Sequence, residues 1–210
     1  MTHGPEPERV TALAVVATTP EVLSHPDLDE GLLAPWERRR LTRIRLPGRR
    51  DDVLAARLLA RLCVARVTGL PPDTPALAQL CPGCGGQDHG RPYLRDHPGV
   101  GVSLSHADGL VAAAVGRGAI GIDVEPSTRR PGPARVLRRL LPEADLAEAA
   151  AQADPGSALL RLWVRAEARL KAGRTGETGP DELRLREWTD RPRAAVAAVA
   201  STTGITIASV

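Results

Sequence analysis

Two long segments of helical periodicity, each flanked by strand-like segments, constrain the fold of this 210-residue chain more than any other feature. The first helix is expected over 51–68, where Leu54, Leu58 and Leu62 recur at helical spacing. The second is expected over 157–172, directly before Gly173. Shorter helices are predicted at 34–44, 133–141 and 143–152. Strands are predicted at 10–17, 100–104, 110–116, 119–125, 182–188, 193–199 and 204–209.

A strand, helix, strands arrangement thus occurs twice, which predicts an α+β fold. Residues 70–99 are rich in Pro, Gly and Cys and are expected to form an irregular connection. We therefore expect two halves, 1–99 and 100–210. The three strands after the connection are interpreted as a meander with short turns, one of them at Asp108-Gly109.

Composition limits the classes of protein that fit. Aromatic residues make up 2% of the chain and phenylalanine is absent, so Leu, Val and Ala must fill the core. With one Tyr and three Trp, the chain lacks stacking platforms for nucleic acid despite a pI near 9.1. No apolar stretch is long enough to span a bilayer, no signal peptide is recognisable, and three cysteines are too few for a disulfide framework. We expect a cytoplasmic protein with no nucleic-acid or membrane partner.

Positive charge is concentrated in residues 36–66, which hold ten Arg against three acidic residues. This basic segment would attract phosphates or an acidic partner, or it could be a solvated helix face. The position of Arg49 and Arg50 in a turn favours the first interpretation. Outside the segment, Lys171 is notable because it is the one lysine in the chain, and an ammonium group is not equivalent to a guanidinium at a crowded phosphate.

Two carboxylates, Asp123 and Glu125, are two residues apart on a predicted strand and therefore lie on one face. Together they could bind one Mg²⁺, which keeps further positions for water and phosphate. The alternative is that Ile122 and Val124 face the core while both carboxylates face water.

The helix at 157–172 places Trp163, Glu167 and Lys171 on one face, because they are spaced by four residues. Glu167 and Lys171 could be a third metal ligand and a phosphate clamp, or only an exposed ion pair. Trp163 is expected to pack in the core. His106 is expected to open a turn, where its imidazole could reach a phosphate or simply lie on the surface.

The order of these motifs resembles a known family. Ser105-His106, then Gly121-Ile-Asp-Val-Glu125, then Trp163 followed by Glu167 and Lys171 is similar to the motifs SHS, G(I/V)D(I/V)E and WxxKExxxK. These motifs are typical of 4′-phosphopantetheinyl transferases of the surfactin-synthetase-activating type. The resemblance is specific over residues 90–173 and looser over 36–66. It implies a pseudo-duplicated fold of two similar α/β halves in one monomeric chain, with coenzyme A bound between them.

The resemblance implies transfer of the phosphopantetheine arm of coenzyme A to a serine of an acyl or peptidyl carrier protein in polyketide, nonribosomal peptide or fatty acid synthesis. The reaction would use Mg²⁺, or Mn²⁺ in its place, and release 3′,5′-adenosine bisphosphate. By motif, the metal ligands would be Asp123, Glu125 and Glu167, and the catalytic groups would be Glu167, Lys171 and His106. Glu167 would also activate the carrier serine. Coenzyme A would contact Arg38, Arg40, Arg43, Arg50, Gly90, Arg91, Pro92, Ser105, His106 and Lys171.

The sequence departs from the family pattern at three places. Ala166 replaces the Lys of WxxKE, Asp52 stands where many relatives have Arg, and Val102-Ser103 replaces Phe-Asn. Ala166 and Asp52 motivate a second hypothesis, a non-catalytic relative that binds coenzyme A or a carrier protein, whereas the intact Asp123, Glu125, Glu167 and Lys171 argue against it.

Cys81-Pro-Gly-Cys84 has the spacing of half a zinc knuckle, and His89 and His97 are near enough in the chain to complete four ligands. The run could instead only shape the connecting loop. A small zinc-dependent nucleic-acid binder is the third hypothesis, but it has only half a zinc site and few aromatic residues.

Overall fold

A computed structural model describes residues 11–73, 77–87, 89–131, 137–138, 141–173 and 183–210. Six strands form the larger of two sheets: β1 (Ala12–Thr18), β2 (Leu77–Leu80), β3 (Arg91–Leu94), β4 (Val100–Ala107), β5 (Leu110–Arg117) and β9 (Ile205–Ala208). Their order is β2-β3-β4-β5-β1-β9. The smaller sheet contains β6 (Ile120–Pro126), β7 (Arg184–Asp190) and β8 (Ala195–Ser201) in the order β6-β8-β7. The fold is therefore mixed α and β.

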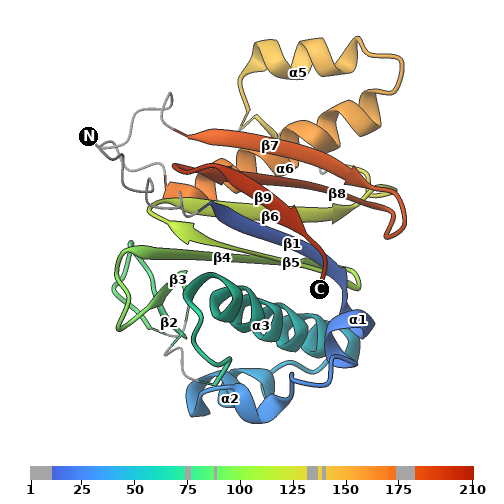
Figure 1. The fold of residues 1–210 in the computed structure, drawn as a ribbon. Coiled ribbons are helices and arrows are strands. Elements are labelled where there is room, and N and C mark those ends of the chain that lie inside the picture. Colours follow the sequence, from blue (N-terminus) through green and yellow to red (C-terminus); the bar gives the residue numbers. More distant parts are fainter. Residues whose placement is uncertain (1–10, 74–76, 88, 132–136, 139–140, 174–182) are drawn as a thin grey trace, which may run out of the picture.

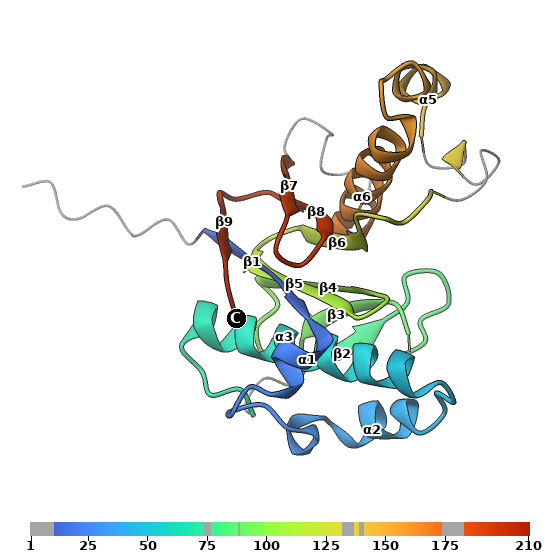
Figure 2. The same ribbon diagram turned by 90° about the vertical axis from the view of Figure 1, so that its right-hand side faces the viewer.

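The sheets pack face to face, and each is covered on its outer side by a long helix (Figure 1). Helix α3 (Pro47–Thr68) covers the six-stranded sheet, and α6 (Pro155–Gly173) covers the three-stranded sheet. Helices α1 (Thr19–Leu23) and α2 (Pro35–Leu41), with the 3₁₀ turn η1 (Glu30–Leu32), lie near α3. Helix α5 (Glu143–Ala150) lies beyond α6, as the second view shows (Figure 2).

Strand alternation explains how β8 serves two cores at once. Ala195, Ala197 and Val199 face the layer between the sheets, whereas Val196, Ala198 and Ala200 face α6. All six side chains are buried, which is why this strand is continuously apolar. The layer between the sheets also contains alanines from β1 and β5, and its small side chains fit the scarcity of aromatic residues.

The turn between β4 and β5 is formed by Asp108 and Gly109, as the sequence predicts. Both have positive φ, 45° and 84° respectively, and Ala107 pairs with Leu110 across the hairpin. Two positive φ angles are typical of a type I′ turn, for which Asp-Gly is a favoured pair.

Three expectations need correction. Residues 70–99 are not wholly irregular, since they contain the hairpin strands β2 and β3. The expected meander ends at β5, because β6 pairs with β8 in the other sheet. Arg49 and Arg50 lie within α3 and not in a turn. The larger sheet takes strands from both sides of residue 99, and a division of the chain there stays a prediction. The predicted helix 133–141 lies largely outside the described residues.

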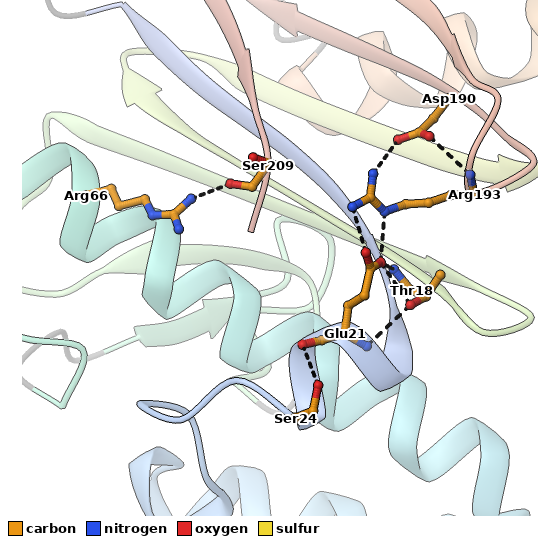
Figure 3. Close-up of polar contacts among 7 residues, drawn as sticks. All are labelled: Thr18, Glu21, Ser24, Arg66, Asp190, Arg193 and Ser209. Carbon is orange, nitrogen blue, oxygen red and sulfur yellow. Dashed lines mark hydrogen bonds and ion pairs between the residues drawn. The ribbon is translucent and has the colours of Figure 1, made fainter.

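Polar contacts join the end of the chain to its beginning (Figure 3). Arg193, in the turn between β7 and β8, binds both Asp190 and the α1 residue Glu21, with Nη2 2.7 Å from Glu21 Oε1. Arg66 on α3 donates to the backbone oxygen of Ser209 over 2.6 Å. These contacts help to hold β7, β8 and the C-terminal residues against the helices of the larger sheet. None of the helices in the described ranges combines the length and hydropathy needed to cross a bilayer.

Candidate active site

Strand β6 presents Asp123 and Glu125 to helix α6. Ile122 and Val124 point into the layer between the sheets, so alternation directs Asp123 and Glu125 to the opposite face. Their residues are only 5% and 7% exposed. The prediction that they share a face is confirmed, and the alternative that they merely face water is wrong.

Gly121 allows α6 to approach β6 closely. A Cβ at this position would lie 2.0 Å from the backbone oxygen of Ala168 and 2.4 Å from the backbone nitrogen of Ala172. Only a residue without a side chain fits this contact. The glycine thereby brings the last turns of α6, which carry Glu167 and Lys171, against the strand that carries Asp123.

Lys171 crosses from α6 to the carboxylate of Asp123. Its Nζ lies 2.6 Å from Asp123 Oδ1 and 3.0 Å from Ser105 Oγ, and Ser105 Oγ donates to the same Oδ1 over 2.7 Å. The ion pair of Lys171 is therefore made with a buried strand residue, and the idea of an exposed pair with Glu167 alone is not supported.

Two serines of β4 connect the two sheets at this point. Ser103 Oγ accepts a hydrogen bond from the backbone N–H of Ile122 over 3.0 Å, and Ser105 binds Asp123 as described above. Both serines are buried. The Val102-Ser103 departure from the family motif thus supplies a hydroxyl that satisfies a backbone group of β6.

Carboxylates are crowded around Asp123. Burial raises the pKa of Glu125, and the negative charge of Asp123 adds to the effect, although Arg129 and a hydrogen bond from Trp163 oppose it. Burial and Asp123 also raise the pKa of Glu167, against the effect of Lys171. Glu125 is further held by Arg129, whose Nη1 lies 2.7 Å from Oε2. Additional positive charge would favour the ionised forms of these groups.

A divalent cation fits this donor set. Asp123 Oδ2 is buried and has no hydrogen-bond partner within the described part of the chain, which is costly for an ionised oxygen. Glu125 and Glu167 lie near enough to Asp123 for its charge to raise their pKa values. The oxygens of the three residues are not all within 4.8 Å of one another among the described residues. One ion would therefore be held by fewer than three of them, or the side chains would have to draw together.

His106 lies within β4 rather than in the following turn, and it points away from Ser105. Val102 and Leu104 belong to the core under α3, so alternation places His106 on that same face. Burial lowers its pKa. Asp52 acts to raise the pKa, whereas Lys171, Arg49 and Arg40 lower it further. His106 thus lies between the carboxylate cluster and the start of α3.

The basic segment divides into internal and exposed arginines. Arg57 and Arg61 are 3% and 2% exposed and bind the buried carboxylate of Glu37, with Arg57 Nη1 2.7 Å from Oε1. Arg57 also lies over the ring of Trp36, 4.9 Å from its centroid. These two arginines support the fold, so the surface charge of the segment is lower than its composition indicates.

The four arginines predicted to bind coenzyme A are placed differently. Arg38 donates to the backbone oxygens of Gly31 and Leu33, and Arg50 Nη2 lies 2.6 Å from Glu30 Oε2. Arg40 and Arg43 line a cavity of about 640 Å³. The cavity is also lined by Trp36, Arg39, Ala78, Gln79, Gln87, His89 and Arg95. Arg39 belongs to the basic segment and could have been predicted to line the cavity. Nothing in the sequence indicated that Arg95 would line it as well.

Gly90-Arg91-Pro92 starts strand β3. Gly90 has a φ of 98°, and a Cβ there would lie 2.3 Å from the backbone oxygen of Leu80. Pro92 pairs with Gln79 on β2, and Arg91 Nη2 lies 3.4 Å from the backbone oxygen of Leu170 on α6. Arg91 therefore connects the β2–β3 hairpin to the helix that carries Lys171.

The two substituted positions have separate surroundings. Asp52 is buried and accepts from Thr19 Oγ1 over 2.5 Å and from the backbone N–H of Gly109 over 3.2 Å. It thus anchors α3 to α1 and to the β4–β5 turn. Ala166 lines a cavity of about 750 Å³ between α5 and α6, together with Arg165 and Arg169.

Part of the chain matches a known protein family. A search of curated proteins found none that matches the chain. Residues 119–206 match the family model described as ACPS, 4′-phosphopantetheinyl transferase superfamily. The matched stretch runs from β6 to β9 and contains Asp123, Glu125, Glu167 and Lys171, but not His106 or the basic segment. Residues 119–206 are therefore similar to the 4′-phosphopantetheinyl transferase superfamily, a superfamily of transferases.

Proposed function

We propose that this protein transfers the 4′-phosphopantetheine arm of coenzyme A to a serine of an apo acyl or peptidyl carrier protein and releases 3′,5′-adenosine bisphosphate. The main support is the buried Asp123 Oδ2, which has no hydrogen-bond partner among the described residues and lies in a cluster of carboxylates within the matched residues 119–206. Such a cluster suits a metal ion at a pyrophosphate.

In this proposal the side chains of Asp123, Glu125 and Glu167 draw together to hold Mg²⁺, or Mn²⁺ in its place. When bound, the ion would offset negative charge that develops on the pyrophosphate. Lys171 and His106 bind pyrophosphate oxygens in this proposal. The ammonium of Lys171 and an imidazole N–H of His106 can each donate a hydrogen bond to such an oxygen. Lys171 would therefore bind a phosphate oxygen as well as the carboxylate of Asp123.

Glu167 accepts the proton of the carrier serine, directly or through water. The serine oxygen then forms a bond to the nearer phosphorus of the pantetheine arm, and the bond from that phosphorus to the oxygen of 3′,5′-adenosine bisphosphate breaks. The raised pKa of Glu167 suits this role, because a general base accepts a proton best when its pKa approaches the working pH.

Coenzyme A binding is assigned to the basic cavity and the strands beside it. Arg40 and Arg43 would contact the 3′-phosphate, and the cavity also offers Arg39 and Arg95. Arg38 and Arg50 remain in the proposal, although contacts within the chain already engage them. Gly90, Arg91, Pro92 and Ser105 complete the proposed surface. The exposed charge would also attract an acidic carrier protein.

We also propose that the chain consists of two similar halves, residues 1–99 and 100–210. It would then be a monomer of the surfactin-synthetase-activating type. A long helix on the outer face of each sheet is compatible with such a duplication. A non-catalytic relative that binds coenzyme A or a carrier protein is the second candidate, and Ala166 is the observation that favours it.

Mass spectrometry of apo carrier proteins incubated with the protein, coenzyme A and Mg²⁺ tests the proposal. We expect the carrier to gain one phosphopantetheine group, and EDTA to prevent the gain. Asp123→Asn should slow transfer by about 100-fold or more because it removes a charged metal ligand. Asp27→Asn is the control, since Asp27 is exposed and its side chain is outside the site.

Binding of coenzyme A without transfer to any carrier would instead support the non-catalytic relative. Full activity of Asp123→Asn would contradict the assigned metal site.

A further inference from the structure

Three side chains with metal-binding atoms meet in the connection between β2 and β3. The ligand atoms of Cys81, Cys84 and His89 all lie within 4.8 Å of one another, and no other such group of three occurs among the described residues. Cys84 and His89 are exposed and Cys81 is partly buried. The group includes none of the carboxylates to which the metal of the proposed transfer reaction is assigned.

The backbone around the cysteines has the shape of a metal knuckle. The N–H of Gly85 donates to the oxygen of Cys81 over 2.9 Å, and the N–H of Cys81 donates to the oxygen of Gly86 over 2.8 Å. Gly85 has a φ of 69°, which glycine adopts without strain. The loop therefore turns tightly enough to bring both sulfurs to one side.

Backbone amides point at the sulfurs and prepare them for a cation. Amides of Cys84 and Gly83 donate to the sulfur of Cys81. The N–H of Gly86 lies 3.4 Å from Cys84 Sγ. Amide donors favour thiolates, the form of cysteine that binds metal.

The spacing of the ligand atoms agrees with a tetrahedral site. A sulfur and a nitrogen on one zinc ion are about 3.6 Å apart, and Cys84 Sγ lies 3.3 Å from His89 Nε2. Gly86 leaves room for these ligand atoms, because a Cβ at this position would lie 2.9 Å from His89 Cε1 and 3.2 Å from Cys84 Sγ. Any larger residue at position 86 would push into the cluster.

We propose that Cys81, Cys84 and His89 bind a zinc ion that braces the β2–β3 connection. Two thiolates and an imidazole bind zinc in preference to hard cations such as Mg²⁺. His97, the other histidine considered from the sequence, does not belong to this group of described residues. The fourth position is open to water or another ligand.

The zinc ion would also steady one wall of the basic cavity. His89 lines that cavity together with Arg39, Arg40 and Arg43. Gly90 follows His89 and its oxygen accepts from Gln79 Nε2 over 3.2 Å, while Gln79 Oε1 accepts from the buried Arg57. If the proposed function holds, loss of zinc should weaken coenzyme A binding more than it slows the transfer step.

Metal analysis of the purified full chain, kept reduced and free of chelators, tests the site. We expect about one zinc per chain, and a tetrahedral cobalt spectrum with thiolate bands when Co²⁺ replaces zinc. Cys84→Ser should lower the zinc content at least about tenfold. The matched controls are Cys63→Ala, a buried cysteine of α3, and His97→Ala, and both should keep the metal.

Absence of bound zinc, together with no cobalt–thiolate bands after Co²⁺ is added to the reduced protein, would overturn the proposal. Unchanged zinc content in Cys84→Ser would do the same. These readings do not depend on activity: a protein that binds zinc through Cys84 but transfers nothing would contradict the proposed function and leave the zinc site standing. A higher KM for coenzyme A in Cys84→Ser, with kcat little changed, is the result expected if both proposals hold.

Discussion

The ammonium of Lys171 lies 2.6 Å from Oδ1 of Asp123, although the two residues are 48 positions apart in the chain. Ser105 donates to the same oxygen, whereas Oδ2 has no hydrogen-bond partner in the described ranges. Two side chains, one from a helix and one from a strand, thus bind the same oxygen of the carboxylate, and neither binds the other oxygen. This asymmetry suits a carboxylate that connects a lysine to a metal ion.

Lys171→Arg tests whether the compact ammonium matters. A guanidinium is planar and larger, so it should not fit between Asp123, Ser105 and a phosphate without displacing one of them. We expect kcat/KM for carrier modification to fall about tenfold or more. Arg117→Lys, an exposed exchange of the opposite kind, should leave the rate unchanged. Wild-type activity in Lys171→Arg would show that any cation suffices.

Glu167→Gln should reduce transfer and yet stabilise the metal-free protein. The raised pKa of Glu167 means that the folded protein holds this proton more tightly than the unfolded chain does. The resulting stability is present below the ordinary carboxyl pKa and is lost as the pH rises through the raised value. At about pH 8 the uncharged Gln should therefore raise Tm in EDTA, while transfer falls about 100-fold or more.

Glu143→Gln is the comparison for this variant, because it removes an exposed carboxylate from α5. Its effect on the free energy of unfolding should stay within about 0.5 kcal/mol. A lower Tm for metal-free Glu167→Gln would mean that ionised Glu167 is not a source of repulsion in the site.

Gly121→Ala should separate α6 from β6. The new Cβ would lie 2.0 Å from the backbone oxygen of Ala168, so the helix must shift. Overpacking of this kind costs about 1–3 kcal/mol, and activity should fall because Lys171 moves with the helix. Gly48→Ala is the control, since nothing lies within 4 Å of its added Cβ. Urea unfolding and transfer assays on both variants measure the effect on stability and activity. Equal stability and activity in the two variants would show that the close approach of α6 to β6 is not needed.

Glu21→Gln should lower stability at neutral pH but not in acid. Hydrogen bonds from Arg193 lower the pKa of Glu21 to about 2 from its ordinary value of 4.5. The contribution is therefore present above 4.5 and is lost as the pH falls towards 2. Because the pair is partly exposed, we expect a cost of only about 0.5–1 kcal/mol. The free energies of unfolding in urea of the wild type and Glu21→Gln should differ near neutral pH and converge in acid. A difference that does not change with pH would exclude the ionised pair as its cause.

Local patterns predicted the parts of this protein whose structure depends on nearby residues. The long helices, the strands at 110–116 and 193–199, and the Asp108-Gly109 turn all follow from periodicity or backbone preference. The shared face of Asp123 and Glu125 follows from strand geometry. The hairpin of β2 and β3 was missed because its strands are short and lie among Pro, Gly and Cys residues.

Pairing between distant residues was decided only by the tertiary structure. The sequence determined that β6 would be a strand with its carboxylates on one side, and that Glu167 and Lys171 would share a helix face. It did not determine that β6 would leave β5 for β8, that a buried Glu37 would engage Arg57 and Arg61, or that His106 would face away from Ser105. Those outcomes depend on which surfaces pack together, and the free energy of that packing is summed over contacts far apart in the chain.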